Sequence, residues 1–367
     1  MGYQGEFNSI FGSEEFEKKL TEEDFNYYRD ELPKMVEEMA KHLSPSDIHK
    51  VNPAINYKLV TVSVDAGQNE IFPNLEDFSM GVLRVSSSSD DIKTGIPHFI
   101  HLIRDYHFSR DNSKRAFDLF LQEDLIAKFM EKTGITPEDL GKSWASPGRF
   151  LRVARDISEW AYILNVLSLY GDVRMVVAKD GGLMQENLTH EFNRKLKEYF
   201  NRANCFVVGV LKSTALFKDG VSRCVLSDWM EMADGSFYFQ VPNPLMEHVF
   251  RHQKFWLAEE AAEGKENHKA SYALGRRYIL RLLPNEIYPL DGVIAIDVST
   301  HIQPDSSELR DIMATILNGR SYLFGGSFIP VIEAHSKASI SKEIKEQIEA
   351  TIRKKAKTKY LGNSFTG

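Results

Sequence analysis

The sequence predicts an α/β fold, in which helices flank a mixed β-sheet. Two observations predict this fold class. Short apolar runs with strand periodicity alternate along the chain with longer segments of helical periodicity. Two of the predicted strands, 173–179 and 205–211, enclose a helix-like segment, and this order implies a right-handed crossover between neighbouring parallel strands.

The composition excludes several other classes of protein. Hydrophobic residues make up 43% of the 367 residues and charged residues 26%, which excludes a disordered, collagen-like or coiled-coil chain. No stretch has the roughly 18 uninterrupted apolar residues of a membrane helix, and the acidic, polar N-terminus differs from a secretory signal. We therefore expect a soluble, cytoplasmic protein. Because the formal charge is −7, a nucleic acid could bind only through local basic patches, metal ions or a partner.

The N-terminal part, residues 1–54, is predicted to be a helical extension. Apolar residues recur there at helical spacing between residues 14 and 43, among dense charges, which is typical of an amphipathic helix. Turns that contain proline end this element. We divide the rest of the chain into a main domain, 55–345, and a basic C-terminal helix with its tail, 346–367.

The main domain is predicted to open with two strands. The first, 57–64, is expected to end at Asp65-Ala66-Gly67, and the second, 80–85, is expected to pair with it and to end in the polar cluster 86–91. Later elements are predicted in chain order as helices at 114–131 and 149–170, the two strands named above, strands at 236–241, 277–283 and 292–298, and a helix at 306–318.

Two predicted strands run into an aspartate that small residues follow. These aspartates are Asp65 and Asp180. Sites collect at the strand ends of α/β sheets, and small neighbours let a phosphate or a metal approach the backbone closely. Two carboxylates on adjacent strand ends can share divalent metal, as phosphodiester cleavage requires. The alternative is an ordinary turn, the commoner reason for Asp-Gly after a strand.

Two further candidates lie close to the Asp180 strand in the sequence. Glu159 lies on the preceding helix, where it can supply a third carboxylate; the alternative is a solvated ion pair with Arg155, four residues before it. Lys212 ends the following strand and is expected at the same edge of the sheet. A lysine there can anchor a scissile phosphate, or it can be an ordinary solvated side chain.

Three more residues complete the candidates. Asp297 ends another apolar run, although a turn or cap is the favoured interpretation. His335 follows a glycine-rich turn and can ligate a metal or transfer a proton, whereas a histidine among apolar neighbours is more often a core residue. Glu333 beside it is a weaker candidate. Basic clusters, above all residues 353–359, can contact a phosphate backbone, although such runs are usually solvated faces.

Several common active-site motifs are absent from the sequence. It contains no P-loop, no Rossmann glycine fingerprint, no HExxH zinc motif and no GxSxG serine motif. The two cysteines, Cys205 and Cys224, are too few for a disulfide framework or a four-ligand zinc site. ATP hydrolysis, Rossmann cofactors, zincin chemistry and hydrolase-type serine catalysis therefore lack a motif in this sequence.

Taken together, four segments of the chain resemble the NurA nuclease family. They are Ser63-Val64-Asp65-Ala66-Gly67, Ala178-Lys179-Asp180-Gly181-Gly182-Leu183, Val208-Gly209-Val210-Leu211-Lys212-Ser213 and Ile329-Pro330-Val331-Ile332-Glu333-Ala334-His335. Their order and spacing also fit, and the resemblance spans roughly residues 55–345. The chain departs from the family pattern where Ala66-Gly67 replaces glycine-serine and where Gly182 replaces a serine. Because both aspartates are kept, these changes leave the metal site in place and the rate and metal preference open.

The resemblance implies an RNase H-like core and manganese- or magnesium-dependent exonuclease and endonuclease action on DNA. It also implies a homodimer that docks onto a hexameric HerA-type translocase, in DNA end processing or antiphage defence. By the resemblance, Asp65 and Asp180 match metal-binding aspartates, Glu159 matches the acidic residue on the helix before the second motif, and Lys212 and His335 match later basic positions. We expect Asp65, Glu159 and Asp180 to bind the metal, with Lys212 and His335 steadying the phosphate and moving protons.

Two other functions stay open on the sequence alone. A protein of this fold could be a catalytically weak or inactive adaptor that regulates the translocase ATPase, a possibility that the substituted motif serines favour. It could also be an RNase H-like endonuclease directed at RNA. Binding of Mn²⁺ that depends on Asp65 and Asp180 separates an enzyme from an adaptor, and labelled DNA and RNA substrates separate the two enzymes.

Overall fold

The computed structural model describes most of the chain in fourteen segments. These are residues 30–52, 59–71, 79–89, 101–108, 113–141, 147–169, 175–183, 188–202, 206–211, 214–252, 275–284, 290–304, 306–321 and 327–356. The predicted helix over 14–43 is described only from residue 30, and Lys212 and Cys205 lie outside the described residues.

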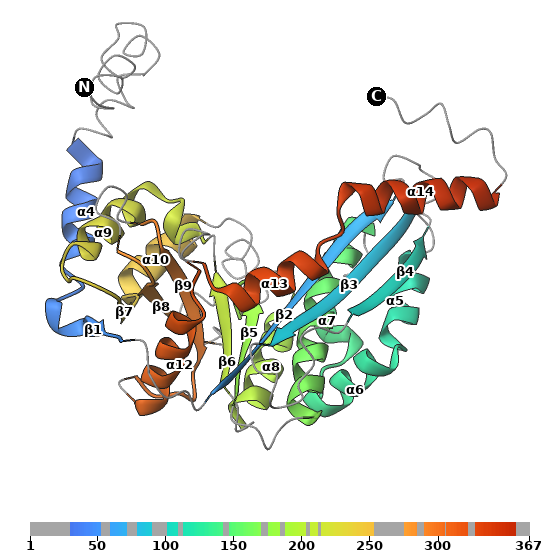
Figure 1. The fold of residues 1–367 in the computed structure, drawn as a ribbon, viewed down its shortest axis with the longest axis horizontal. Coiled ribbons are helices and arrows are strands. Elements are labelled where there is room, and N and C mark those ends of the chain that lie inside the picture. The colour runs from blue at the N-terminus through green and yellow to red at the C-terminus, as the bar shows by residue number, and fades with distance from the viewer. Residues whose placement is uncertain are drawn as a thin grey trace, which may run out of the picture.

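One mixed sheet runs through the whole molecule and carries helices on both faces (Figure 1). In the described residues it has nine strands in the order β1-β7-β8-β9-β6-β5-β2-β3-β4. The strands are β1 His49–Lys50, β2 Val60–Ile71, β3 Ser79–Ser89, β4 His101–Phe108, β5 Met175–Asp180, β6 Phe206–Leu211, β7 Phe237–Gln240, β8 Gly275–Arg281 and β9 Val293–Ser299.

The described helices are α4 Leu32–Ala40, α5 Ser113–Leu121, α6 Asp124–Thr133, α7 Pro147–Leu169, α8 His190–Arg202, α9 Gly220–Met230, α10 Asn243–His252, α12 Ser307–Asn318, α13 Ile329–Ala338 and α14 Lys342–Ala356. Helices α5 to α10 lie in the connections between strands, whereas α4 precedes β1 and α12, α13 and α14 follow β9. Short 3₁₀ turns add η2 Pro45–Asp47, η3 Pro137–Leu140 and η4 Ala215–Phe217. None of the helices in the described part of the chain is both long enough and apolar enough to cross a membrane.

Five adjacent strands have an RNase H-like arrangement. In the order β4-β3-β2-β5-β6, the first three strands form an antiparallel meander, while β5 is parallel to β2 and β6 is parallel to β5. Helix α7 precedes β5, and α8 connects β5 to β6 by the predicted crossover. The α/β fold class with a mixed, RNase H-like sheet is therefore confirmed, and β9, β8, β7 and β1 extend the sheet beyond β6.

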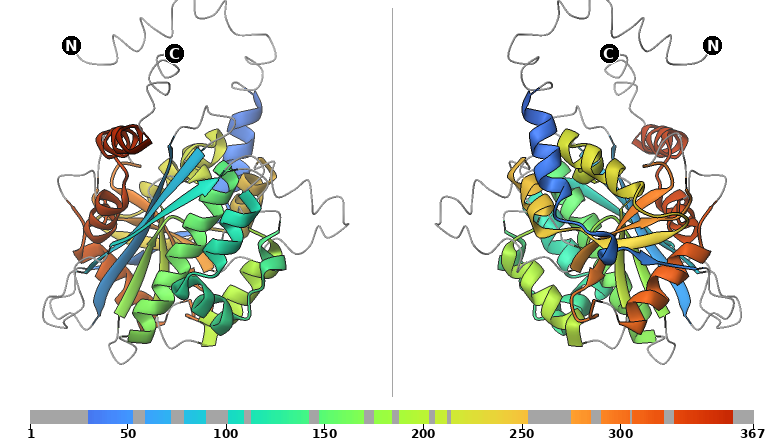
Figure 2. Two further views of the ribbon diagram at one scale, coloured as in Figure 1. Left: turned by 90° about the vertical axis from the view of Figure 1, so that its right-hand side faces the viewer. Right: turned by 90° about the vertical axis from the view of Figure 1, so that its left-hand side faces the viewer.

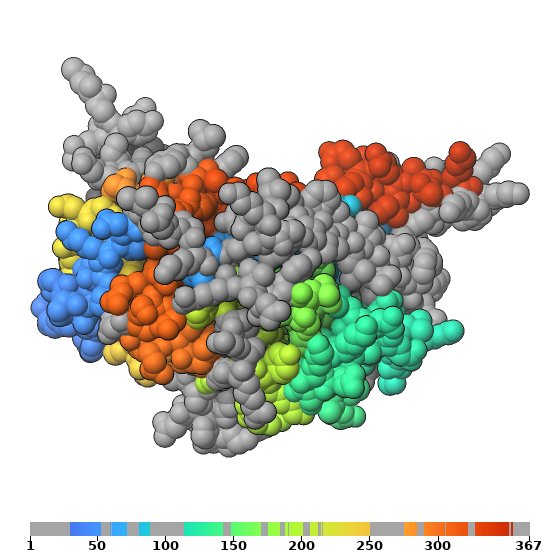
Figure 3. Space-filling view, turned by 60° about the horizontal axis from the view of Figure 1, so that its bottom comes forward, coloured from blue at the N-terminus to red at the C-terminus, as the bar shows by residue number. Residues whose placement is uncertain are grey.

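Alternating side chains of the strands enter cores on opposite faces of the sheet. Val177 packs in the cluster formed with α5 to α8, which includes Trp160 and Phe192, whereas its neighbour Val176 packs in the cluster formed with α12. A third cluster around Trp229 joins α4, α9 and α10 to β7 and β8. Figure 2 shows α13 and α12 on one side of the sheet and α5 to α7 on the other. Helix α14 stands out from the body (Figures 1 and 3).

Two strands continue past the points where the sequence predicts their ends. Strand β2 runs through Asp65-Ala66-Gly67 to Ile71, because β3 pairs with it along this whole length. Strand β3 runs through Ser86 to Ser89. The prediction that a polar cluster ends β3 is wrong because Ser86 and Ser88 donate hydrogen bonds to helix α13, which lies on that face. The predicted helix 114–131 is also two helices, α5 and α6.

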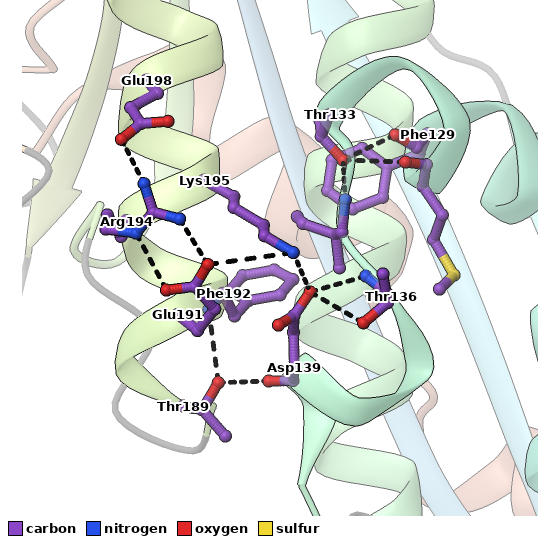
Figure 4. A network of polar contacts seen from close by, with 12 residues as sticks. Phe129, Thr133, Thr136, Asp139, Thr189, Glu191, Phe192, Arg194, Lys195 and Glu198 are labelled. Atoms are coloured by element: carbon purple, nitrogen blue, oxygen red, sulfur yellow. Dashed lines mark hydrogen bonds and ion pairs between the residues drawn. The ribbon is translucent and has the colours of Figure 1, made fainter.

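A polar network around Asp139 fastens α8 to the η3 turn (Figure 4). Thr136 donates to Asp139 Oδ2 from its backbone nitrogen at 2.6 Å and its hydroxyl at 3.1 Å, and Lys195 Nζ lies 2.7 Å from the same oxygen. Thr189 Oγ1 donates to the Asp139 carbonyl. Burial acts to raise the pKa of Asp139, but the hydrogen bonds from Lys195 and Thr136 outweigh it and hold that pKa below its ordinary value.

We expect Asp139→Asn to lower the free energy of unfolding by about 1–3 kcal/mol at neutral pH, because a charged hydrogen-bond partner of Lys195 is lost. A lowered pKa makes this contribution present above the ordinary aspartate value of 3.8 and lost as the pH falls through the lower folded value. Urea denaturation at several pH values measures it. Asp118→Asn, which removes an exposed pair with Lys114, is the control and should change little. A difference from wild type that is the same at pH 7 and pH 3 would contradict this account.

Candidate metal centre

Three side chains distant in sequence converge at one point of the sheet. Within the described residues, they form the group of His, Cys, Asp or Glu side chains whose ligand atoms all lie within 4.8 Å of one another. The group consists of Asp65 from β2, Asp180 from β5 and His335 from α13. Two of the three predicted metal-binding carboxylates therefore meet, together with the predicted histidine.

The pairing of β2 with β5 places the two aspartates side by side. The strands are parallel, and their last registered pair is Val64 with Lys179, so Asp65 and Asp180 each follow by one residue. Val64 packs in the core beneath α7. Because successive side chains of a strand alternate, both aspartates face the opposite side, which carries α13. Strand β2 continues beyond the end of β5, and its pairing with β3 holds Asp65 in mid-strand.

One imidazole nitrogen of His335 lies between the two carboxylates. Nδ1 is 2.7 Å from Asp65 Oδ2 and 3.3 Å from Asp180 Oδ2. The Asp65 side chain is 8% exposed and that of Asp180 19%, whereas His335 is 60% exposed. The centre is therefore closed by the sheet below and open to solvent on the side of His335.

A close approach at Gly67 lets α13 lie directly on the sheet. A Cβ at Gly67 would lie 2.1 Å from the carbonyl oxygen of Ala338, at the last residue of the helix. Such a distance is far inside van der Waals contact, so any side chain here would lift the helix. The small residues Ala334 and Ala338 are fully buried on the face that α13 turns to the sheet.

Side chains of β3 hold the backbone of α13. Ser86 Oγ donates to the carbonyl of Ala334 at 2.6 Å, one residue before the histidine. Arg84 Nη1 donates to the carbonyls of Lys337 at 3.1 Å and Ser339 at 3.3 Å, at the C-terminus of the helix. A cation at this end satisfies the last carbonyls and favours the helix dipole. These bonds fix the position from which His335 reaches the aspartates.

The two neighbouring carboxylates repel each other, so a positive charge between them would be stabilising. Burial raises the pKa of Asp65, the neighbouring Asp180 raises it further, and His335 acts in the opposite direction; the net effect is a raised pKa. A divalent cation between the carboxylates would remove both the burial cost and the repulsion. Carboxylate oxygens with an imidazole nitrogen form a donor set that suits Mn²⁺ and similar ions, so the residues present fit a metal.

Glu159 lies beside this group but is not among its three members. Its Oε1 accepts a hydrogen bond from the backbone nitrogen of Ala66 at 3.2 Å, and its Oε2 lies 2.5 Å from Lys179 Nζ. Burial raises the pKa of Glu159 to about 7, although Lys179 opposes the shift. The interpretation of Glu159 as a solvated partner of Arg155 is wrong, because Glu159 is buried and Arg155 forms a 2.8 Å ion pair with Asp156.

Asp297 braces the turn that follows Asp180. Its carboxylate accepts bonds from Arg277 Nε at 2.8 Å and Nη2 at 3.0 Å, and from the backbone nitrogen of Leu183 at 3.1 Å. The interpretation of Asp297 as a turn or cap residue is wrong, because it is buried within β9. The sequence held one sign of this buried pair: a charged residue, Arg277, lies inside another predicted apolar strand, where it could neutralise Asp297.

The other candidates have separate places. Glu333 accepts a 2.5 Å hydrogen bond from Ser88 Oγ, and so it helps to hold α13 on strand β3. Lys212 is outside the described residues, and its predicted role stays a prediction. Sequence reasoning missed Lys179 as the partner of Glu159 and Gly67 as the contact point for α13. The presence of a lysine inside the apolar strand 175–180 could have indicated that Lys179 has a buried acidic partner.

Comparisons with known proteins give matches among solved structures. No family model and no curated protein matches the sequence. A crystal structure of the NurA nuclease from Sulfolobus solfataricus is similar at 12% identity, covering 95% of this chain and 99% of that one, with a TM-score of 0.45. A structure of NurA bound to dAMP and manganese is similar at 11% identity, over 92% and 97%, with a TM-score of 0.43. An endonuclease V structure from Bacillus subtilis follows at 13% identity, over 86% and 92%, with a TM-score of 0.31. Two of these descriptions name the family that the four sequence segments resemble.

Proposed function

We propose that this protein is a metal-dependent nuclease that hydrolyses phosphodiester bonds of DNA. The observation that carries the proposal is the meeting of Asp65, Asp180 and His335 on the face of an RNase H-like sheet that carries α13, at a point open to solvent beside His335. Two carboxylates share one imidazole nitrogen there, and the raised pKa of Asp65 reflects its burial and the second negative charge.

Three residues of the centre would bind the metal, and neighbouring elements would hold these residues in position. Asp65, Asp180 and His335 would hold a divalent ion, Mn²⁺ or Mg²⁺, and the imidazole ligand favours Mn²⁺ because Mg²⁺ prefers oxygen. Such an ion stabilises charge on a phosphate and lowers the pKa of water. Asp65 is fixed by β3, and Asp180 by the turn that Asp297 braces. His335 is exposed at the opening, so a substrate that reaches the ion passes beside it.

The wider setting of the activity is proposed from the four sequence motifs. Their resemblance supports a homodimer that acts with a hexameric HerA-type translocase, in DNA end processing or antiphage defence. Lys212 is proposed to steady the scissile phosphate by the same resemblance. A translocase that grips the DNA would explain how a chain with a charge of −7 is supplied with a polyanion.

The test is cleavage of labelled linear DNA by the purified protein with Mn²⁺, with Mg²⁺ and with EDTA, each with and without the translocase. We expect DNA degradation that requires the metal and is abolished by EDTA. RNA of the same sequence is the matched substrate, and its preferential cleavage would overturn the assignment to DNA. Absence of cleavage in every condition, together with no heat of Mn²⁺ binding in calorimetry, would support the adaptor instead.

A further inference from the structure

We propose that Arg277 is a positioning residue for the nuclease centre, because it holds in place, through Asp297, the turn that follows Asp180. This inference rests on the proposed function and concerns how one residue of the same site is fixed. Arg277 lies on β8, and β9 and β6 separate that strand from β5 in the sheet. Arg277 can therefore act on Asp180 only through the residues between them.

The residues that connect Arg277 with the end of β5 form a row across the sheet. Arg277 pairs with Asp297 of β9, which in turn pairs with Gly209 of β6. Gly209 is in register with Lys179, the residue before Asp180. Side chains in such a row point to one face of the sheet. This is the face opposite α12 and α13, because the residues on either side of Asp297 pack in the cluster formed with α12.

The turn after Asp180 crosses β6 at Gly209. A Cβ at Gly209 would lie 2.6 Å from the carbonyl oxygen of Gly181 and 2.9 Å from the backbone nitrogen of Leu183, so a side chain here would push the turn away. The backbone nitrogen of Gly181 also donates to the carbonyl of Val210 at 2.9 Å. The turn therefore lies directly on β6.

The Asp297 carboxylate binds the far end of this turn. Its Oδ2 accepts the hydrogen bond from the backbone nitrogen of Leu183 at 3.1 Å, and a Cβ at Gly182 would lie 3.1 Å from the same oxygen. Arg277 donates to the carboxylate from both Nε and Nη2. The Asp297 side chain is 6% exposed and that of Arg277 14%, so the guanidinium, and not water, supplies the positive charge beside Asp297.

The same guanidinium also contacts the segment that follows β6. Its Nη1 donates to Thr214 Oγ1 at 3.5 Å, so Arg277 joins the segments that leave β5 and β6. Asp180 is the last residue of β5, and its position therefore depends on the turn that follows it. Its Oδ2 lies 3.3 Å from His335 Nδ1 on the opposite face of the sheet. A turn that shifted on β6 would move this carboxylate within the centre.

The experiment measures the Mn²⁺ affinity of full-length Arg277→Lys by calorimetry, with urea denaturation of the same samples. Lysine keeps the charge but cannot replace the fixed pair of hydrogen bonds that the guanidinium makes. We expect the affinity to fall by about 10–100-fold, the range seen when the support of a metal ligand is removed. Arg276→Lys is the matched control. Arg276 is the neighbouring residue of β8, faces the other side of the sheet and donates to the carbonyls of Thr300 and Ile302.

The control should bind Mn²⁺ as the wild type does, even where its free energy of unfolding falls. A loss of Mn²⁺ affinity confined to Arg277→Lys supports Arg277 as a positioning residue. Wild-type affinity in Arg277→Lys, or an equal loss in both variants, would overturn the inference while the nuclease assignment stands. If Arg277→Lys does not fold, Asp297→Asn keeps the shape of the side chain and should lose affinity in the same way; unchanged affinity there would also overturn the inference. No bound Mn²⁺ and no DNA cleavage in the wild type would overturn the proposed function as well.

Discussion

Asp180→Asn is expected to lower the rate of metal-dependent DNA cleavage by on the order of 10²–10⁴-fold. The substitution keeps the shape of the side chain but removes one of the two charges that would hold the ion. It also removes the repulsion that raises the pKa of Asp65, so the variant should be at least as stable to heat as the wild type. Initial rates at saturating Mn²⁺, with melting curves on the same samples, measure both effects.

The combination of lost activity and kept stability is the informative result. A structural role for Asp180 would lower the melting temperature together with the rate, whereas a role in metal binding lowers the rate alone. Asp118→Asn, which alters an exposed carboxylate on α5, is the control for charge and should cleave normally. Cleavage by Asp180→Asn at the wild-type rate would remove the carboxylate pair from the mechanism.

The sequence was sufficient for the central part of the fold. Apolar runs with strand period marked β5 and β6, and the intervening helical pattern predicted their parallel pairing, which the structure confirms. The same reasoning predicted that Asp65 and Asp180 would lie close together, since both follow apolar strands. The strands could be predicted because their hydrophobic periodicity is local in the sequence. Their parallel pairing could be predicted because crossover connections are right-handed.

The rest of the site depends on contacts that no local pattern encodes. His335 lies 270 residues after Asp65, and it reaches that carboxylate only because α13 lies on β2 and β3. The polar residues 86–89 have the sequence pattern of a loop. They form part of a strand because Ser86 and Ser88 donate hydrogen bonds to α13, which a local pattern does not show. The helical pattern placed Glu159 on α7, but its pairing with Lys179 depends on how α7 packs against β5, which no local pattern encodes.

Gly67→Ala is expected to damage the centre although Gly67 has no side chain that could bind a metal. The new Cβ would lie 2.1 Å from the Ala338 carbonyl, which is backbone and cannot rotate away, so α13 must shift. We expect a loss of about 1–3 kcal/mol in the free energy of unfolding, as for other overpacked sites. Because His335 moves with α13, the affinity for Mn²⁺ should also fall by about 10–100-fold, the range seen when the support of a ligand is disturbed.

Gly148→Ala supplies the matched control for this substitution. Gly148 lies in the first turn of α7, and a Cβ there meets nothing within 4 Å. The change should leave Mn²⁺ affinity unaltered and raise stability by up to about 1 kcal/mol, because alanine favours a helix more than glycine does. Calorimetric titration and urea denaturation of the two variants give the comparison. If Gly67→Ala bound Mn²⁺ as tightly as Gly148→Ala, the position of His335 would not depend on the close seating of α13, and the contacts from Arg84 and Ser86 alone would have to hold the helix in place.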